Sequence, residues 1–331
     1  MSTNAYSPLR WGILGAGSIA RRFSSDVKSL ADHKLAAVGS RDQAKADAFA
    51  SEFGIPNRHA SYEALVADPE VDIVYVATPH TFHREHALLA LRAGKPVLCE
   101  KPFTINAAEA EEVVKEARER GLFLMEGMWT RCFPVMHRLR ELAKSGAIGE
   151  PRLLQADFGF RAGVNPDSRL FNLALGGGGL MDVGIYPVSL ASMLFGAADR
   201  STALANIGAT GVDEEMAILL AYPGGELATL STAVRLNTPQ AATLVGTEGT
   251  IVVSSPWWCP KQLVVSRSGQ APATEEFPFT GGGFQFEAAH VADCLRAGKT
   301  ESDIIPLDET LSILRTLDGL RAQIGLRYPM E

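Results

Sequence analysis

The sequence predicts an α/β protein with two domains: an N-terminal doubly wound parallel sheet, and a C-terminal α+β domain with a large, mostly antiparallel open sheet. The chain has 331 residues, more than one hydrophobic core usually organises, and 46% of them are hydrophobic. Apolar runs alternate with amphipathic stretches until about residue 127, and strand-like segments dominate later. We therefore place the domains at residues 1–128 and 129–331.

A repeated strand and helix pattern predicts the first domain. Near-continuous apolar runs, typical of strands buried on both faces, occupy residues 10–17, 34–41, 71–79, 95–102 and 122–128. Amphipathic stretches, predicted to be helices, occupy residues 18–30, 44–54, 82–94 and 106–121. This βαβ alternation predicts five or six parallel strands.

The second domain has a different rhythm. We predict a helix at residues 133–146, a strand at 152–160 and, after a glycine-rich loop, a helix from about Met181 to Phe195. Between about Ser201 and Ser268, successive β-rich segments with Gly and Pro at their turns predict an antiparallel sheet. Helices return from Gly283 onward.

Composition limits the function classes. A formal net charge of −7 leaves no basic excess for nucleic acid. The first ten residues lack the apolar core of a signal peptide, and no later window offers eighteen uncharged apolar residues, so we expect no membrane span. Neither a metal-binding pair nor a disulfide scaffold is indicated by Cys99, Cys132, Cys259 and Cys294. We expect a cytoplasmic protein with reduced thiols.

A glycine-rich turn follows the first predicted strand. Residues 15–20 read Gly-Ala-Gly-Ser-Ile-Ala, a pattern whose glycines let the backbone approach a pyrophosphate at the start of the next helix. Flavin and adenosylmethionine sites also use such turns. The position directly after the first strand favours a nicotinamide dinucleotide.

The end of the second predicted strand distinguishes the two nicotinamide cofactors. An acidic residue there accepts hydrogen bonds from the ribose 2′-hydroxyl of NAD, whereas this chain has Ser40 and Arg41. A hydroxyl and a guanidinium suit the 2′-phosphate of NADP, so we expect NADP, with NAD as the second choice. Ser40 and Arg41 also disfavour a methyltransferase, because adenosylmethionine has no 2′-phosphate. The structural alternative is that Arg41 only begins the next helix in solvent.

Three further residues are candidates for catalysis. Lys101 ends the apolar run at 95–102, at the carboxyl edge of the sheet, where ligands of doubly wound folds bind. Asp182 and Tyr186 stand four residues apart and therefore share one face of the predicted helix. Each has a structural alternative: an exposed lysine, a capping acid and a buried tyrosine.

These segments carry a family resemblance. Residues 12–20 (GILGAGSIA), 100–102 (EKP) and 176–187 (GGGGLMDVGIYP) resemble the Gfo/Idh/MocA oxidoreductases over nearly the whole chain. Residues 122–134, residues 256–265 and a tyrosine where many members have histidine resemble one branch of that family. It contains dimeric dihydrodiol dehydrogenases, glucose-fructose oxidoreductases and NADP-dependent aldose (xylose) dehydrogenases.

The resemblance implies roles for individual residues. It implies that Lys101 and Tyr186 form the catalytic pair and that Asp182 binds substrate or orients the pair. Further substrate contacts are expected from Trp129, Arg131, Phe158 and Trp258. Cofactor contacts are expected from Gly15, Ala16, Gly17, Ser18, Ile19, Ser40, Arg41, Thr78, Pro79, His80, His83, Glu100, Lys101, Trp129 and Arg131.

The expected chemistry is reversible hydride transfer between nicotinamide and a secondary alcohol or hemiacetal, with Tyr186 as general base or acid. Lowering the pKa of a free tyrosine from about 10 by about 3 units needs about 4 kcal/mol. A lysine ammonium about 4 Å away supplies about that much at an effective dielectric near 20. Polar and aromatic pocket candidates leave aldose, polyol and trans-dihydrodiol substrates open.

The histidines at positions 80, 83 and 86 recur at a spacing that also suits zinc. We expect no metal, because hydride transfer needs no Lewis acid when a lysine polarises the oxygen. Contact of His80 and His83 with cofactor or substrate, or plain helix capping, explains them better.

Two further expectations concern partners and function. An antiparallel sheet with one face open favours a homodimer through that face, and a short N-terminal segment favours release of the cofactor after each turnover. The main alternative to an enzyme is a cofactor-binding, sugar-responsive regulator without turnover. The presence of Lys101, Asp182 and Tyr186 disfavours it.

Overall fold

The computed structural model describes residues 7–331 and divides into two compact units. The first unit comprises Met1–Thr104, Ala108–Trp129 and Thr280–Leu307, and the second comprises Ile105–Ala107, Thr130–Phe279 and Asp308–Glu331. The chain passes from one unit to the other after Trp129, one residue beyond the predicted boundary. The structure differs from a division into two ranges because Thr280–Leu307 returns to the first unit.

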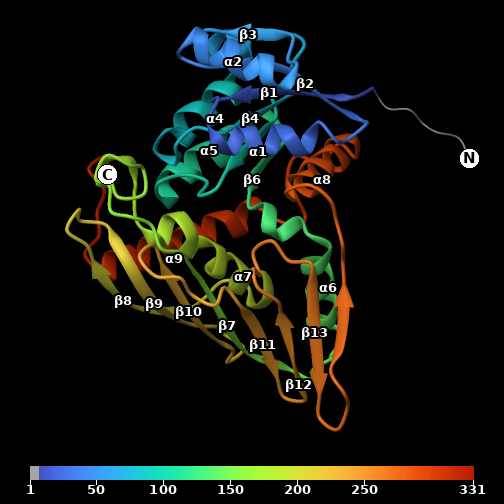
Figure 1. The fold of residues 1–331 in the computed structure, drawn as a ribbon, viewed down its shortest axis with the longest axis vertical. Helices are drawn as coiled ribbons and strands as arrows, with labels where there is room; N and C mark the ends of the chain where they lie inside the picture. The colour runs from blue at the N-terminus through green and yellow to red at the C-terminus, as the bar shows by residue number, and fades with distance from the viewer. Residues whose placement is uncertain (1–6) are drawn as a thin grey trace, which may run out of the picture. The chain divides into compact units, whose positions relative to one another are not determined.

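A six-stranded parallel sheet forms the centre of the first unit (Figure 1). Its strands are β1 (Leu9–Leu14), β2 (His33–Gly39), β3 (Asn57–His59), β4 (Ile73–Val76), β5 (Val97–Glu100) and β6 (Leu124–Gly127). They lie in the order β3-β2-β1-β4-β5-β6. The central strands are buried on both faces, which explains their near-continuous apolar sequences. The strand order reverses at β1 and β4, so the ligand crevice of such a sheet lies at their carboxyl ends.

The helices of the first unit connect these strands. They are α1 (Ser18–Val27), α2 (Gln43–Phe53), α3 (Tyr62–Val66), the 3-10 turn η1 (His80–Phe82), α4 (His83–Arg92) and α5 (Ala107–Arg120), joined by the distant α8 (Phe284–Arg296). The carboxylate of Asp26 accepts the backbone N–H groups of Gly282 and Phe284 at 2.8 and 2.9 Å. This capping ties the start of α8 to α1, so a segment far away in sequence completes the first unit.

An eight-stranded sheet dominates the second unit (Figure 1). Its strands are β7 (Pro151–Gly159), β8 (Arg200–Ile207), β9 (Asp213–Ala221), β10 (Leu227–Ala233), β11 (Ala242–Gly246), β12 (Gly249–Val253), β13 (Gln262–Arg267) and β14 (Ala273–Glu276). Their order is β14-β13-β12-β11-β7-β10-β9-β8. All neighbours are antiparallel except β7 and β10, which run parallel.

The remaining elements of the second unit are mostly helical. They are the 3-10 turns η2 (Trp129–Cys132) and η3 (Leu173–Leu175), α6 (Pro134–Lys144), the π-helical turn η4 (Leu180–Gly184), α7 (Ile185–Phe195) and α9 (Leu307–Gln323). The first residues of η2 and α9 still belong to the first unit. Helix α7 packs on β7 and β10. By length and composition alone, Leu173–Phe195 is apolar enough to cross a membrane, but 78% of its most apolar window is buried inside the protein. A buried core helix has the same composition.

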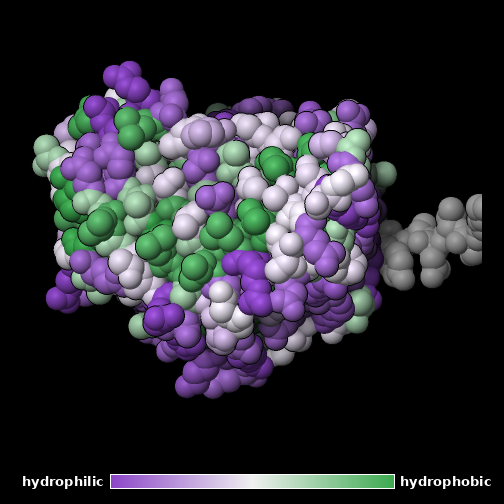
Figure 2. Space-filling view, turned by 90° about the horizontal axis from the view of Figure 1, so that it is seen from below, coloured by the Kyte–Doolittle hydropathy of each residue, from purple (hydrophilic) through white to green (hydrophobic). Residues whose placement is uncertain are grey.

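The other face of this sheet is open near β8, β9 and β10. Strand β9 alternates buried and exposed residues, and its exposed row includes Leu219, 56% accessible. Leu204 on β8 is 77% accessible and Leu227 on β10 is 50% accessible. Figure 2 shows hydrophobic residues gathered on the face of the molecule seen from below. The predicted fold class is confirmed, and β3 and β14 are short polar strands that the hydrophobic pattern did not indicate.

Candidate functional site

A cavity of about 720 Å³ lies in the first unit where β1, β2 and β4 end. It is lined by predicted cofactor residues, namely Gly15, Ala16, Gly17, Ser40, Arg41, Thr78 and Pro79. Three loops that are far apart in sequence thus meet in one cavity. Its position is the switch point at which doubly wound folds bind their ligands.

The glycine turn shapes the cavity for close backbone approach. Gly15 has a φ of +101°, and an added Cβ would lie 3.1 Å from Thr78 Cγ2 and 3.2 Å from the Ala77 carbonyl oxygen. Gly17 precedes α1 and provides no capping side chain, while Ser18 and Ile19 form the first turn of the helix. The N–H groups of that turn have no partner within the helix and favour an anion. The geometry fits the pyrophosphate of a dinucleotide.

Ser40 and Arg41 lie directly after β2, at the edge of the same cavity. The Arg41 guanidinium lies 5.7 Å above the centre of the Phe82 ring, and its side chain is exposed. Its charge also acts on His86, whose pKa is lowered to about 4 by burial and by the nearby guanidinium. A cation over an aromatic ring at this position suits an adenosine with a phosphorylated ribose.

One acidic residue, Asp42, also lines this cavity. The carboxylate of Asp42 caps α2 by accepting the N–H groups of Ala44 and Lys45 at 3.0 and 3.4 Å. Arg21 and Lys45 line the same cavity. Three cationic side chains, Arg21, Arg41 and Lys45, therefore line the cavity with one carboxylate, so the lining carries a net positive charge.

His83 and His80, which we predicted to contact cofactor or substrate, are both buried, and His83 contacts backbone groups of the protein itself. His83 is 1% exposed, its Nε2 lies 2.7 Å from the Thr78 carbonyl oxygen, and its Nδ1 lies 2.9 Å from the Pro102 carbonyl oxygen. Burial lowers the pKa of this imidazole to about 4, so the ring is neutral at pH 7. A neutral imidazole has one N–H group, so His83 donates to only one of these two carbonyl oxygens, and its ring lies between the loop after β4 and the loop after β5. His80, at the start of η1, is also buried.

Lys101 lies at the end of β5, in a loop fixed by two buried carboxylates. Glu100 accepts the Tyr75 hydroxyl at 2.5 Å and the Lys101 backbone N–H at 3.1 Å. Glu126 accepts the backbone N–H of Phe103 at 3.2 Å. Burial and the Glu100 charge raise the pKa of Tyr75 well above its usual value, so its phenol remains a donor. These bonds set the backbone of the residue that we predicted to be catalytic.

Trp129 and Arg131 follow β6 and belong to different units. Trp129 stacks on Phe284 of α8, with ring centres 4.4 Å apart and 7° between the planes. Arg131 is buried in the second unit, where its guanidinium binds the carboxylate of Glu309 at 3.0 and 3.1 Å and the Ser189 carbonyl oxygen at 3.2 Å. These contacts account for the burial of Arg131 without a ligand.

The second unit brings Tyr186, Phe158 and Trp258 together. Tyr186 is the second residue of α7, and its ring lies edge-on to Phe158 with centres 5.2 Å apart. Phe158 stacks on Trp258 at 5.0 Å with 1° between the planes. The indole N–H of Trp258 donates to Gln240 at 3.0 Å. A phenol beside a flat aromatic pair suits a hydroxylated ring substrate.

Asp182 and Tyr186 share one continuous helical run, as predicted, but its first turn is π-helical. Such turns are frequent at functional sites. The carboxylate of Asp182 binds the guanidinium of Arg169 at 2.7 Å, and Arg169 is 42% exposed. Arg169 lies in a loop without periodicity, so no sequence signal indicated that it would meet Asp182.

Within residues 7–331 one group of side chains has the spacing of metal ligands, and it is not the histidine series we considered. His290, Cys294 and Asp303 place their ligand atoms within 4.8 Å of one another. The Ser302 hydroxyl already lies 2.7 Å from His290 Nε2, Lys299 binds Asp303 at 3.2 Å, and burial raises the pKa of Cys294. The group is explained by these contacts alone.

Comparison with known proteins agrees with this geometry. Residues 9–128 match the family model described as "Oxidoreductase family, NAD-binding Rossmann fold", and residues 136–252 match "GFO/IDH/MocA C-terminal domain". Trans-1,2-dihydrobenzene-1,2-diol dehydrogenase of Mus musculus is 42% identical, with 98% of this chain and 99% of that protein covered. The Homo sapiens protein of the same name is 38% identical with the same coverage.

Solved structures share the fold over nearly the whole chain. An aldose-aldose oxidoreductase from Caulobacter crescentus, complexed with glycerol, matches with a TM-score of 0.87 and 28% identity, covering 96% of this chain and 98% of that one. A 3-ketoreductase from Actinomadura kijaniata, in complex with NADP and TDP-benzene, matches with a TM-score of 0.86, 27% identity and the same coverage. These findings confirm the predicted fold and oxidoreductase class, and this chain belongs to the Gfo/Idh/MocA oxidoreductase family.

Proposed function

We propose that this protein is an NADP(H)-dependent oxidoreductase that transfers a hydride between nicotinamide and a CH–OH group of a trans-dihydrodiol, aldose or polyol. The observation that carries this proposal is the cavity of the first unit, where a glycine turn meets Arg41 and Ser40 in place of an acidic residue. Gly15, Gly17, Thr78 and the start of α1 would hold the dinucleotide, and NADP supplies a hydride acceptor at its nicotinamide ring.

The aromatic cluster of the second unit supports the substrate class. Phe158 and Trp258 offer flat apolar faces beside the Tyr186 phenol, and Asp182 and Arg169 add polar groups near the same helix. We place trans-dihydrodiols first, because the relatives with that activity are about 40% identical to this chain over its length, whereas sugar oxidoreductases are more distant.

Tyr186 and Lys101 would perform the proton chemistry. As the hydride leaves carbon, the substrate hydroxyl must lose its proton, and the phenolate of Tyr186 would accept it. The Lys101 ammonium would stabilise that phenolate and lower its pKa, an effect of about 4 kcal/mol at about 4 Å and an effective dielectric near 20. In the reverse direction the phenol would return the proton to the carbonyl oxygen.

The test measures nicotinamide absorbance with NADP and NAD against a panel of trans-dihydrodiols, aldoses and polyols. Tyr186→Phe and Lys101→Met are compared with the matched controls Tyr222→Phe and Lys28→Met, which change residues outside both clusters. We expect turnover with NADP to fall at least about 100-fold in the first pair and to persist in the controls. Crystals of the 3-ketoreductase with one lysine or one tyrosine replaced still hold NADP and TDP-benzene, so binding should survive.

Two outcomes would overturn this proposal. Full turnover in Tyr186→Phe would remove the phenol from the mechanism. NADP binding without turnover on any panel member, in either direction, would favour the regulator that binds cofactor and sugar without catalysis.

We also propose a homodimer that forms through the open face of the eight-stranded sheet. Leu204, Leu219, Leu227 and Leu236 are each at least half exposed there, and a shallow depression of about 370 Å³ lies among the same strands. Exposed apolar area of this kind is typical of an interface. We place the enzyme in the cytoplasm, because all four cysteines are free thiols.

A further inference from the structure

The loop and helix that carry Asp182 and Tyr186 are held by a buried carboxylate from a neighbouring strand. Asp213, at the start of β9, is fully buried. Its Oδ2 atom accepts the backbone N–H of Leu180 at 2.6 Å, at the first residue of the π-helical turn η4. The residue before that turn, Gly179, has no side chain to cap the helix. Asp213 therefore takes the place of a capping residue from outside the helix.

The glycine run allows this carboxylate to come close to the backbone. An added Cβ at Gly178, whose φ is +122°, would lie 2.1 Å from the Asp213 Oδ1 atom. At Gly179 an added Cβ would lie 3.3 Å from Oδ2. Any side chain at Gly178 would displace the carboxylate. The four glycines at 176–179 are thus explained in part by Asp213, not only by loop flexibility.

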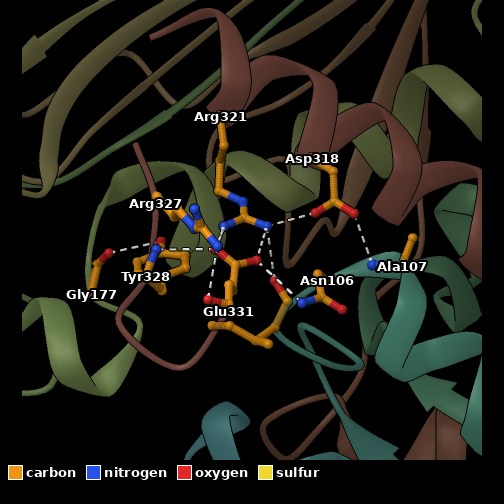
Figure 3. A network of polar contacts seen from close by, with 9 residues as sticks. Asn106, Ala107, Gly177, Asp318, Arg321, Arg327, Tyr328 and Glu331 are labelled. Carbon is orange, nitrogen blue, oxygen red and sulfur yellow. Dashed lines mark hydrogen bonds and ion pairs between the residues drawn. The ribbon is translucent and has the colours of Figure 1, made fainter. Parts of the chain in front are cut away.

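Two further hydrogen bonds fix the same loop. The Tyr328 hydroxyl donates to the Gly177 carbonyl oxygen at 2.9 Å, and the Thr232 hydroxyl on β10 donates to the Gly179 carbonyl oxygen at 3.2 Å. Figure 3 shows Tyr328 within a network of Arg321 and Glu331. The Arg321 guanidinium lies 4.9 Å above the Tyr328 ring and binds the Glu331 carboxylate. The loop is therefore anchored at three points, Gly177, Gly179 and Leu180.

We propose that Asp213 is a positioning residue for Tyr186 and Asp182, fixing the start of their helix so that both side chains are held in their reactive orientation. This inference rests on the proposed function. Asp182 lies two residues and Tyr186 six residues beyond the N–H group that Asp213 binds. Without that bond a buried donor loses its partner, and the first turn must shift to satisfy it. A shift of about 1 Å at a reacting group is enough to slow a reaction strongly.

The surroundings of Asp213 act on its charged carboxylate in two opposite ways. Burial raises the pKa of Asp213 from 3.8 to about 7, while the N–H groups of Leu180 and Gly179 and the charge of Arg321 oppose that rise. Burial of this acid is unfavourable unless other interactions compensate for the loss of water. The hydrogen bonds to the catalytic helix are such interactions.

The test compares Asp213→Asn and Asp213→Ala with the control Asp199→Asn, an exposed acid in the same unit. We expect kcat to fall about 10-fold in the Asn variant and about 100-fold in the Ala variant, because the amide oxygen still accepts a weaker bond from Leu180. KM should change much less. The Kd for NADPH should stay within about 2-fold, because the cofactor cavity lies in the first unit.

Hydrogen exchange separates this inference from the proposed function. Peptides covering residues 176–190 should exchange faster in both Asp213 variants than in the unmodified protein, whether or not any substrate turns over. Unchanged exchange there, or full kcat in a folded Asp213→Asn protein, would overturn the role of Asp213. If Asp213→Ala fails to fold, the Asn variant decides. Absence of turnover in the unmodified protein would count against the proposed function alone.

Discussion

Replacement of Arg41 by alanine tests the cofactor preference most directly. The residue lines the cavity after β2, and its guanidinium is exposed above Phe82. A charge-assisted bond from arginine to a phosphate contributes about 1.5–3 kcal/mol, so its loss should weaken NADPH binding about 10- to 150-fold. NADH lacks the 2′-phosphate and should bind the variant within about 2-fold of the unmodified protein.

The neighbouring cations do not compensate for this loss. Arg21 binds Glu52 at 2.9 Å, and Lys45 lies 3.9 Å from Asp42, so both already have carboxylate partners. We therefore expect the loss of NADPH affinity at low salt to lie in the upper half of the range of about 10- to 150-fold. It should shrink as ionic strength rises, because the lost interaction is between exposed charges.

Fluorescence titration of NADPH and NADH measures both affinities in one preparation. Arg22→Ala is the matched control, because Arg22 is an exposed arginine on α1 that does not line the cavity. Equal losses for the two cofactors would mean that Arg41 supports the fold or the adenine and not the phosphate. No loss for NADPH would refute the reasoning from the end of β2.

Three further predictions concern assembly and stability. Leu204→Glu should convert the dimer to a monomer in sedimentation because it charges the open sheet face, whereas Val164→Glu in a loop should not; a persistent dimer in the first variant would refute the proposed interface. Burial raises the pKa of Asp213 to about 7, so the unfolded chain releases this proton first and stability is lost as pH rises from about 4 to about 7. In Asp213→Asn this pH dependence of the unfolding free energy, at most about 4 kcal/mol, should disappear. Urea unfolding at a series of pH values measures it, and the same dependence in variant and unmodified protein would contradict the prediction. Tyr75→Phe should cost about 1–3 kcal/mol of unfolding free energy, because Glu100 loses a buried donor; an unchanged urea midpoint would argue against that bond.

The order of strands and helices in the first unit could be predicted from the sequence because the patterns that indicate them are local. Apolar runs, amphipathic stretches and the glycine turn at residues 15–20 each depend on neighbours within a few positions. Ser40 and Arg41 were predicted from their place at the end of the second strand and Thr78 from the family resemblance, and all three line one cavity because the carboxyl ends of parallel strands meet at one edge.

The site of the second unit could be predicted less fully from the sequence, because it depends on contacts between residues far apart in the chain. Phe158 and Trp258 were expected from the resemblance alone, and Tyr186 also from its spacing with Asp182; the structure shows how the three rings pack. Arg169 and Asp213 were not foreseen, because neither stands in a motif. Each becomes notable only through the residue that it meets, Asp182 or Leu180.

The sequence by itself determined the fold class, the glycine turn and the choice of residues at the end of β2, because periodicity and turn chemistry are properties of short segments. Only the tertiary structure decided that Thr280–Leu307 completes the first unit, that Arg131 binds Glu309 and that Asp213 caps the helix of Tyr186. The residues in these contacts stand tens to hundreds of positions apart. Such pairs form because packing in three dimensions brings buried polar groups together, and each must then find a partner.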